Sequence, residues 1–260
     1  MTSAESSGFL NVSKWPTLEE LSVGFEENLM PASFALVGET IAINFEGNVL
    51  ITHHVDNEKA FEVRTGIFFI DFYKPDFEEH VSLICNRCTG QVIAGLSRLD
   101  STTGEQRTKT EFLHGNINTF TNVPAFPETE ELVRRHIVYR YTPRDAYEHV
   151  YLNRGTLTWH CLSGTEKGLA DTEFSRTFKL GDQLYLLFWT ETIMPVESFV
   201  VVDLQKMRST GRFSCWDPKP QRVVHMLFGS YATQLAKTDA AAVAASPLSM
   251  GTRKHDGNKT

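Results

Sequence analysis

The sequence predicts an all-β protein whose antiparallel strands come from a duplicated unit. The first observation is a series of short apolar runs, each bounded by Gly, Asn, Asp or Pro, with little sustained helical periodicity. The second is a repeat: ETIAINFEGN at 39–48 is echoed by GTLTWHCLSGT at 155–165, and GIFFIDFY at 66–73 by QLYLLFWTE at 183–191. Neighbouring runs are close enough for hairpins, which favours up-and-down pairing into a barrel.

The repeat keeps a nearly constant offset along the chain. Three residue pairs define it: Thr40 with Thr156, Phe69 with Leu187, and Glu79 with Glu197. All three separations are close to ~117 residues, the constancy that an internal duplication requires. The two halves could close into two small barrels or pool their strands into one larger sheet, because a ligand-sized interior needs about eight strands. The sequence leaves both arrangements open.

The N-terminal segment, residues 1–30, is expected to be helical in part. Apolar residues follow Pro16 at helix-compatible spacing, at Leu18, Leu21, Phe25 and Leu29, and the first turn is acidic. One short helix is therefore expected between residues 16 and 30.

The first β repeat is assigned to residues 31–120. Its expected strands are 34–37, 39–46, 49–55, 60–64, 66–73, 80–85, 91–98 and 110–114. Residues 121–147 are interpreted as a connector with a short helix, because prolines precede an acidic opening and a helical spacing of Leu132, Val133, His136 and Ile137.

The second β repeat is assigned to residues 148–235. Its expected strands are 148–152, 155–161, 172–179, 183–191, 198–204, 209–214 and 222–228. Small and polar residues dominate 236–260, so a disordered tail is expected there.

Several of these strands resemble the MoaF-like proteins, a family named after molybdenum cofactor biosynthesis protein F. The resemblance lies in the GTLTW strand, the apolar strand ending in FWTE and the following VVVDL strand, and it extends over about residues 30–230. It implies two related halves with a lipocalin-like, or calycin, antiparallel barrel fold. The first half departs from the pattern, with FIDFY in place of LLFWTE and Ile43 where the second half has Trp159.

Composition argues against several partners and locations. A net charge of -7 and a pI near 5.7 leave no basic stripe for a phosphate backbone, so nucleic-acid binding is not expected. No run reaches the ~18 apolar residues that span a bilayer, so a membrane role is not expected either. The N-terminus lacks a charged and then apolar leader, which favours the cytoplasm. A homodimer is compatible with the sequence.

The cysteines do not form a recognisable framework. The chain has Cys85, Cys88, Cys161 and Cys215, too few and too irregular for a disulfide scaffold. Cys85 and Cys88 form a C-x-x-C pair at an expected strand end and turn, without the second ligand pair that zinc requires. G-x-G-x-x-G, Walker, H-E-x-x-H and G-x-S-x-G patterns are absent from the sequence, so neither a metal nor a cofactor is expected.

A candidate pocket follows from strand alternation in the second half. Alternate residues of a strand share a face, which groups Tyr185, Leu187, Trp189 and Glu191 on one strand and Leu157 and Trp159 on another. If these faces point inward, the lumen suits a flat apolar molecule, and Glu191 becomes an acid or base whose pKa is raised by apolar neighbours. The alternative is that the tryptophans fill the core and Glu191 reaches solvent.

Further candidates lie on other strands. The catalytic candidates beside Glu191 are Tyr141, Arg212 and His225, and the additional substrate-binding candidates are Tyr139, Asp71 and Tyr73. Each has a structural alternative: an ion pair for Asp71, a hydrogen-bonded core histidine for His225, and a connector docked through its aromatics for the two tyrosines of 139–141.

These residues favour a cofactor-independent enzyme that moves a proton on a small hydrophobic or aromatic metabolite, as an isomerase, cyclase or lyase, for example in secondary metabolism. The competing hypothesis is a non-catalytic lipocalin-like protein that binds or carries a small molecule. A third is a scaffold that uses its sheet surface for a partner.

Overall fold

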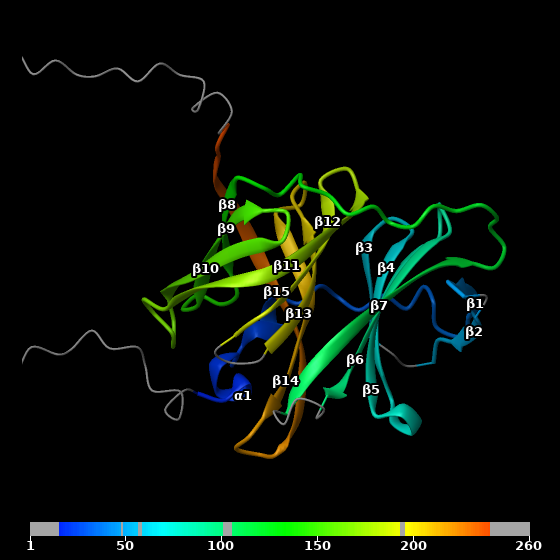
Figure 1. Ribbon diagram of the computed structural model, residues 1–260, viewed down its shortest axis with the longest axis horizontal. Coiled ribbons are helices and arrows are strands. Elements are labelled where there is room, and N and C mark those ends of the chain that lie inside the picture. Colours follow the sequence, from blue (N-terminus) through cyan, green and yellow to red (C-terminus); the bar gives the residue numbers. More distant parts are fainter. Residues whose placement is uncertain (1–15, 48, 57–58, 101–105, 193–195, 240–260) are drawn as a thin grey trace, which may run out of the picture.

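The computed structural model describes residues 16–47, 49–56, 59–100, 106–192 and 196–239, and places two β-sheets side by side (Figure 1). The later part of the chain forms a closed eight-stranded barrel, and the earlier part an open seven-stranded sheet. The fold is therefore all-β and lipocalin-like, as expected. The sequence allowed either two small barrels or one larger sheet, and the structure instead has one barrel beside one open sheet.

The barrel has the strand order β10-β11-β12-β13-β14-β15-β8-β9, and every neighbouring pair is antiparallel. Its strands are β8 (Arg135–Arg140), β9 (Ala146–Asn153), β10 (Thr156–Ser163), β11 (Ala170–Gly181), β12 (Leu184–Thr190), β13 (Val196–Asp203), β14 (Arg208–Asp217) and β15 (Arg222–Lys237). Because β8 pairs with both β15 and β9, it is the strand that closes the cylinder.

The helix predicted in the connector is wrong, because this closing strand occupies its place. Arg134 has a left-handed φ of 68° at the end of a turn, and the chain then enters β8. Ile137 and Tyr139 face the barrel interior, and the residues on either side of each are exposed or half-buried. This is the period-two pattern of a strand. Tertiary pairing on both edges overrides the weak helical spacing that runs through Leu132 and His136.

The open sheet has the order β2-β1-β7-β6-β5-β4-β3. Its strands are β1 (Thr40–Phe45), β2 (Val49–His54), β3 (Lys59–Arg64), β4 (Ile67–Lys74), β5 (Glu79–Asn86), β6 (Gln91–Asp100) and β7 (Arg107–Ile117). Among the described residues β2 and β3 do not pair, so this sheet stays open between them.

The two halves have the same strand order, but the first strand of the repeat was matched to the wrong strand of the second half. β4 to β7 occupy the places of β12 to β15, which supports the pairs Phe69 with Leu187 and Glu79 with Glu197. β1 lies beside β7 as β8 lies beside β15, so β1 corresponds to β8. Pairing Thr40 with Thr156 on β10 was therefore wrong, and the contrast of Ile43 with Trp159 compares strands that are not equivalent.

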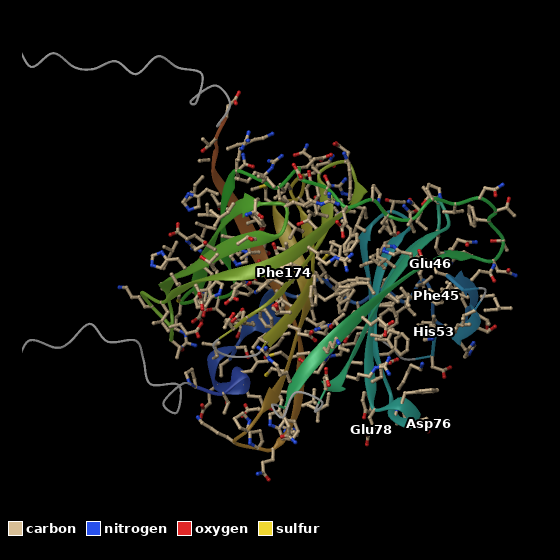
Figure 2. All side chains as sticks on the ribbon, in the orientation of Figure 1. Phe45, Glu46, His53, Asp76, Glu78 and Phe174 are labelled. Carbon is tan, nitrogen blue, oxygen red and sulfur yellow. The ribbon has the colours of Figure 1, made fainter. Side chains whose placement is uncertain are left out.

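Side-chain alternation on β12 divides the core between two environments. Tyr185, Leu187 and Trp189 belong to the cluster inside the barrel, while Leu186 and Phe188 belong to the cluster between the barrel and the open sheet. Figure 2 shows side chains filling both spaces, with Phe45, Glu46 and His53 far from the barrel at the edge of the open sheet.

The N-terminal segment forms two short elements where one helix was predicted: α1 (Leu18–Leu21) and the 3-10 helix η2 (Phe25–Asn28). Gly24 separates them with φ 87°, a conformation that favours glycine. A reciprocal capping box between Thr17 and Glu20 fixes the start of α1.

Three further expectations concern the strand at 34–37, the C-terminal tail and membrane-spanning segments. The predicted strand 34–37 is a turn region, and a short 3-10 helix, η3 (Pro75–Phe77), separates β4 from β5. β15 continues to Lys237, so residues 236–237 belong to the barrel, while the rest of the predicted tail from 240 lies outside the described residues. In the described part of the chain, no helix is long and apolar enough to cross a bilayer.

Candidate functional site

A cavity lies inside the barrel, near the end covered by the N-terminal segment. It is lined by Leu18, Leu21, Phe25, Tyr141, Tyr147, His149, Trp159, Glu166, Trp189, Glu191, Val196 and Phe213. Its volume of about 40 Å³ admits a few water molecules, since one water needs roughly 10–15 Å³ on this measure. Aromatic walls with few polar groups are typical of a site for a small apolar ligand.

The N-terminal segment covers this cavity as a lid. Leu18, Leu21 and Phe25 are buried in its wall, and the ring of Phe25 stacks on Tyr141 with centroids 4.6 Å apart. Elsewhere the lid is held by polar contacts to the barrel, including a hydrogen bond of 2.7 Å from Arg208 Nη2 to the carbonyl oxygen of Asn28. The lid therefore limits the space at this end of the cavity.

Glu191 is a carboxyl group whose pKa is strongly changed by this environment. It follows directly after β12, and its Oε1 accepts a 3.0 Å hydrogen bond from the indole Nε1 of the buried Trp189. Burial raises the pKa of Glu191 to about 8; the Trp189 bond opposes this shift, and the negative charges of Glu166 and Glu173 add to it. The carboxyl is therefore mostly protonated at neutral pH.

A second carboxyl group lines the same cavity. Glu166, in the turn after β10, is 6% exposed and accepts a 2.9 Å hydrogen bond from the phenol of Tyr147. Burial raises the pKa of Glu166, although the Tyr147 bond lowers it in part. The cavity thus holds two carboxyl groups, and burial raises the pKa of both.

His149 is a neutral buried imidazole in the same wall. It lies on β9 at 3% exposure, and burial lowers its pKa to about 3. Its ring makes an edge contact with Trp189, with centroids 5.3 Å apart. Its Nδ1 has no hydrogen-bond partner among the described residues. A buried nitrogen without a partner can accept a hydrogen bond from a ligand or an ordered water.

Glu191 also connects the cavity to the outside. Glu191 and Val196 line the inner cavity and also a groove of about 310 Å³ on the far side of the wall, where Arg107, Thr108 and Lys109 lie. Glu191 therefore lies between the barrel cavity and the outer groove.

Four of the predicted site residues line the cavity, namely Glu191, Tyr141, Trp159 and Trp189. Four others, Leu157, Leu187, Tyr139 and Tyr185, pack in the barrel core without lining it. The Tyr139 hydroxyl lies 2.7 Å from the Tyr151 hydroxyl, and the Tyr185 hydroxyl donates to Glu131, so both are used in internal contacts.

The side chains of the remaining four, Asp71, Tyr73, Arg212 and His225, lie outside the barrel interior. Alternation on β14 turns Phe213 into the cavity and Arg212 toward the open sheet. Arg212 is fully buried and donates to Ser82 Oγ, Ser97 Oγ, Thr110 Oγ1 and the carbonyl oxygen of Glu197. Its guanidinium therefore joins the two sheets and does not contact the cavity.

The sequence-based search did not include Tyr147, His149, Glu166 and Phe213 as site residues. Tyr147, His149 and Tyr151 are spaced two residues apart on β9 and therefore share one face. This spacing is visible in the sequence once residues 146–153 are interpreted as one strand. Phe213 could be found in the same way on β14. Glu166 lies in a turn, where no periodicity identifies it.

The cysteines and acidic residues give no metal site in the described residues. No group of three or more His, Cys, Asp or Glu side chains there is arranged to hold a metal ion. Cys85 ends up near the end of β5 with a pKa raised by burial to about 11, and Cys88 is exposed in the following turn. Thiolate formation at Cys85 is thus disfavoured near neutral pH.

Fold and cavity together define a lipocalin-like barrel joined to an open sheet of related topology. A family model described as the MoaF C-terminal domain matches residues 126–238, and one described as the MoaF N-terminal domain matches residues 13–101. Protein MoaF of Klebsiella aerogenes is 31% identical over 173 residues, which is 59% of this chain and 64% of that protein. The chain belongs to the MoaF-like family.

The comparison with solved structures includes one weak match. It is described as a putative beta-lactamase from Burkholderia vietnamiensis, is 10% identical, and overlaps 40% of this chain and 96% of its own with a TM-score of 0.34.

Proposed function

We propose that the protein is a cofactor-independent enzyme that transfers a proton to a small hydrophobic or aromatic molecule held in the barrel cavity, as an isomerase, cyclase or lyase. The supporting observation is Glu191, a carboxyl in an aromatic cavity whose pKa is raised by burial to about 8. A general acid is most effective when its pKa lies near the working pH.

In this proposal Glu191 is the acid. Its proton goes to an unsaturated carbon of the ligand, and the resulting carboxylate stays hydrogen-bonded to Trp189 Nε1. Glu166, whose carboxyl accepts a hydrogen bond from Tyr147, lies in the same cavity, and in its ionised form it removes a proton from the ligand or stabilises positive charge on it. Trp159, Trp189 and Phe213 supply the flat apolar walls.

Ligand binding requires the lid to move, because the closed cavity of about 40 Å³ is smaller than any aromatic ring compound. Displacing Leu18, Leu21 and Phe25 enlarges this space at its end, and reclosure excludes water from the reacting atoms. Neutral His149 remains available as a hydrogen-bond acceptor for a ligand hydroxyl or N–H.

A panel of small aromatics and terpenoids, screened by quenching of tryptophan fluorescence and followed by product analysis, tests the proposal. For any compound that binds and is converted, Glu191→Gln should abolish turnover and leave affinity within about twofold, because the amide keeps the shape but cannot deliver the proton. Glu46→Gln, at an exposed position on the open sheet, is the matched control with unchanged turnover.

Two outcomes count against the proposal. Unchanged turnover in Glu191→Gln removes Glu191 as the acid. Binding without conversion of any compound favours the alternative of a carrier, for which the enclosed apolar cavity and the lid are equally suited.

A further inference from the structure

A second hollow lies between the barrel and the open sheet, on the side where β15 faces β4 and β5. It has a volume of about 790 Å³ and is lined by Glu26, Leu29, Asp56, Lys59, Asp71, Phe72, Tyr73, His80, His225, Met226 and Leu227. Both sheets and the lid contribute residues, so the hollow, here called the inter-sheet groove, exists only because the two halves pack together.

A buried carboxylate–imidazole pair forms the inner wall of the inter-sheet groove. Nε2 of His225 lies 2.6 Å from Oδ2 of Asp71, and the Ser82 hydroxyl donates to Oδ1 of Asp71 at 2.9 Å. Arg212 Nε in turn donates to Ser82 Oγ at 3.0 Å. Burial would raise the pKa of Asp71, but His225 and Arg212 outweigh it and lower that pKa, so Asp71 is ionised.

The ionised carboxylate fixes the tautomer of His225. Nε2 carries the proton that is held toward Asp71, so in the neutral tautomer of this ring the lone pair is on Nδ1. The side chain is 11% exposed, and Nδ1 has no hydrogen-bond partner among the described residues. Nδ1 itself is buried behind the wall of the groove, and a buried acceptor is unsatisfied until a donor reaches it.

Aromatic rings surround this acceptor. The ring of His80 stacks on His225 with centroids 3.9 Å apart and planes 5° from parallel, and Tyr73 lies 4.7 Å from His80. Burial lowers the pKa of His80 to about 4, so His80 is neutral at physiological pH. Tyr73 is 50% exposed and offers its face to the groove.

The charges along the groove select against anions. Lys59 is opposed by Glu26, Asp56 and Asp71, which leaves the lining net acidic. A phosphate or carboxylate ligand would meet this potential unfavourably, whereas a neutral molecule would not.

We propose that the inter-sheet groove is a second ligand site, separate from the barrel cavity, which binds a neutral planar molecule carrying a hydroxyl or N–H donor. The donor bonds to Nδ1 of His225, Asp71 holds the imidazole in the receptive tautomer, and Tyr73 with His80 contacts the ring of the ligand. None of these four residues lines the barrel cavity, so ligand binding at this site does not depend on proton transfer by Glu191.

Phenol is a suitable probe, because it is neutral, planar and carries one donor. Titration of the full chain with millimolar phenol, followed by long-range ¹H–¹⁵N spectra of the histidines, should shift Nδ1 of His225 in the sense of an accepted hydrogen bond. His136 and His160, which pair with Glu148 on the outer face of the barrel, serve as internal controls and should not move. Anisole, which lacks the hydroxyl, should bind about five- to tenfold more weakly.

A pair of tyrosine variants completes the test without disturbing the buried Asp71. Tyr73→Ala should weaken phenol binding about fivefold or more, whereas Tyr231→Ala, at an equally exposed tyrosine of 51% on β15, should leave it unchanged. A stationary His225 signal at saturating phenol, equal binding of anisole, or perturbation confined to the Trp189 indole would each overturn the second site. The Trp189 signal separately reports the barrel cavity.

Discussion

The indole Nε1 of Trp189 donates a 3.0 Å hydrogen bond to Oε1 of Glu191, two residues further along the chain. Residues two apart on a strand share a face, so the last inward side chain of β12 positions the carboxyl at the cavity wall. With Oε1 accepting from the indole, Oε2 is the oxygen that carries the proton. The same contact restrains the carboxyl after proton loss.

Glu191 makes stability depend on pH in an unusual direction. Its folded pKa of about 8 lies above the unfolded value near ~4.5. Between these values the folded state holds more protons than the unfolded state, so the free energy of unfolding falls as pH rises, by at most about 1.4 kcal/mol per pH unit. Below the unfolded pKa both states are protonated, and this loss is absent.

The variant Glu191→Gln should therefore be more stable than the wild type at pH 8 and nearly equal to it at pH 4. Urea denaturation at a series of pH values measures the difference. An equal pH dependence of the two proteins would contradict the raised pKa.

Arg212 is expected to be essential for joining the two sheets. In Arg212→Met the buried Asp71 and Glu197 lose the positive charge between them, and three hydroxyls of the open sheet and the Glu197 carbonyl oxygen lose their donor. Breaking a buried charged network in this way costs about 3–5 kcal/mol. Urea denaturation should show that loss, whereas Arg144→Met, at an exposed turn position, should change stability by less than about 0.5 kcal/mol. Similar stabilities for both variants would show that Arg212 is dispensable.

The lid should be sensitive to a single methyl group on β15. A Cβ at Gly229 would lie 2.0 Å from the carbonyl oxygen of Asn28 and 2.7 Å from Cα of Leu29, both backbone atoms of the lid region. Gly229→Ala should push η2 off the barrel, cost about 1–3 kcal/mol and speed amide hydrogen exchange in residues 18–28.

A matched glycine provides the control for the lid. A Cβ at Gly181, at the end of β11, would meet only Leu184, at 3.8 Å. Gly181→Ala should leave both stability and exchange of the lid nearly unchanged. Slow exchange of the lid in Gly229→Ala would mean that the segment tolerates displacement and does not pack as described.

The capping box gives a smaller, local prediction. Thr17→Ala removes the acceptor for the Glu20 amide and should destabilise α1 by about 1 kcal/mol. Because α1 is only four residues long, the loss should appear as faster exchange in 18–21 and not in the barrel strands. Equal exchange in the variant would show that packing of Leu18 and Leu21 alone holds the lid.

Strand alternation made most of the fold and about a third of the barrel site predictable. Trp159 and Trp189 could be assigned to one interior because each lies in a regular strand with a clear period of two. β8 was missed because six residues between two turns carry too little pattern to outweigh a weak helical spacing. Its identity as a strand comes from pairing with β15 and β9, which are distant in sequence.

The grouping of polar residues could not be predicted in the same way. Arg212 and His225 lie on strands of the barrel, and the sequence does not say that the outer face of β14 and β15 is covered by a second sheet. Asp71 and His225 are 154 positions apart in sequence, and their side chains form a hydrogen bond only because the two halves pack together. Glu166 depends on the path of a turn, which carries no periodic signal.

The measurement that tests the central claim most directly is the titration of Glu191 itself, followed by the ¹³C shift of its side-chain carboxyl, with Glu191→Gln used for assignment. A protonated acid in the barrel cavity predicts a midpoint at about pH 8. A midpoint near the unperturbed value of ~4.3 would contradict that account, because a carboxylate already ionised at neutral pH has no proton to give.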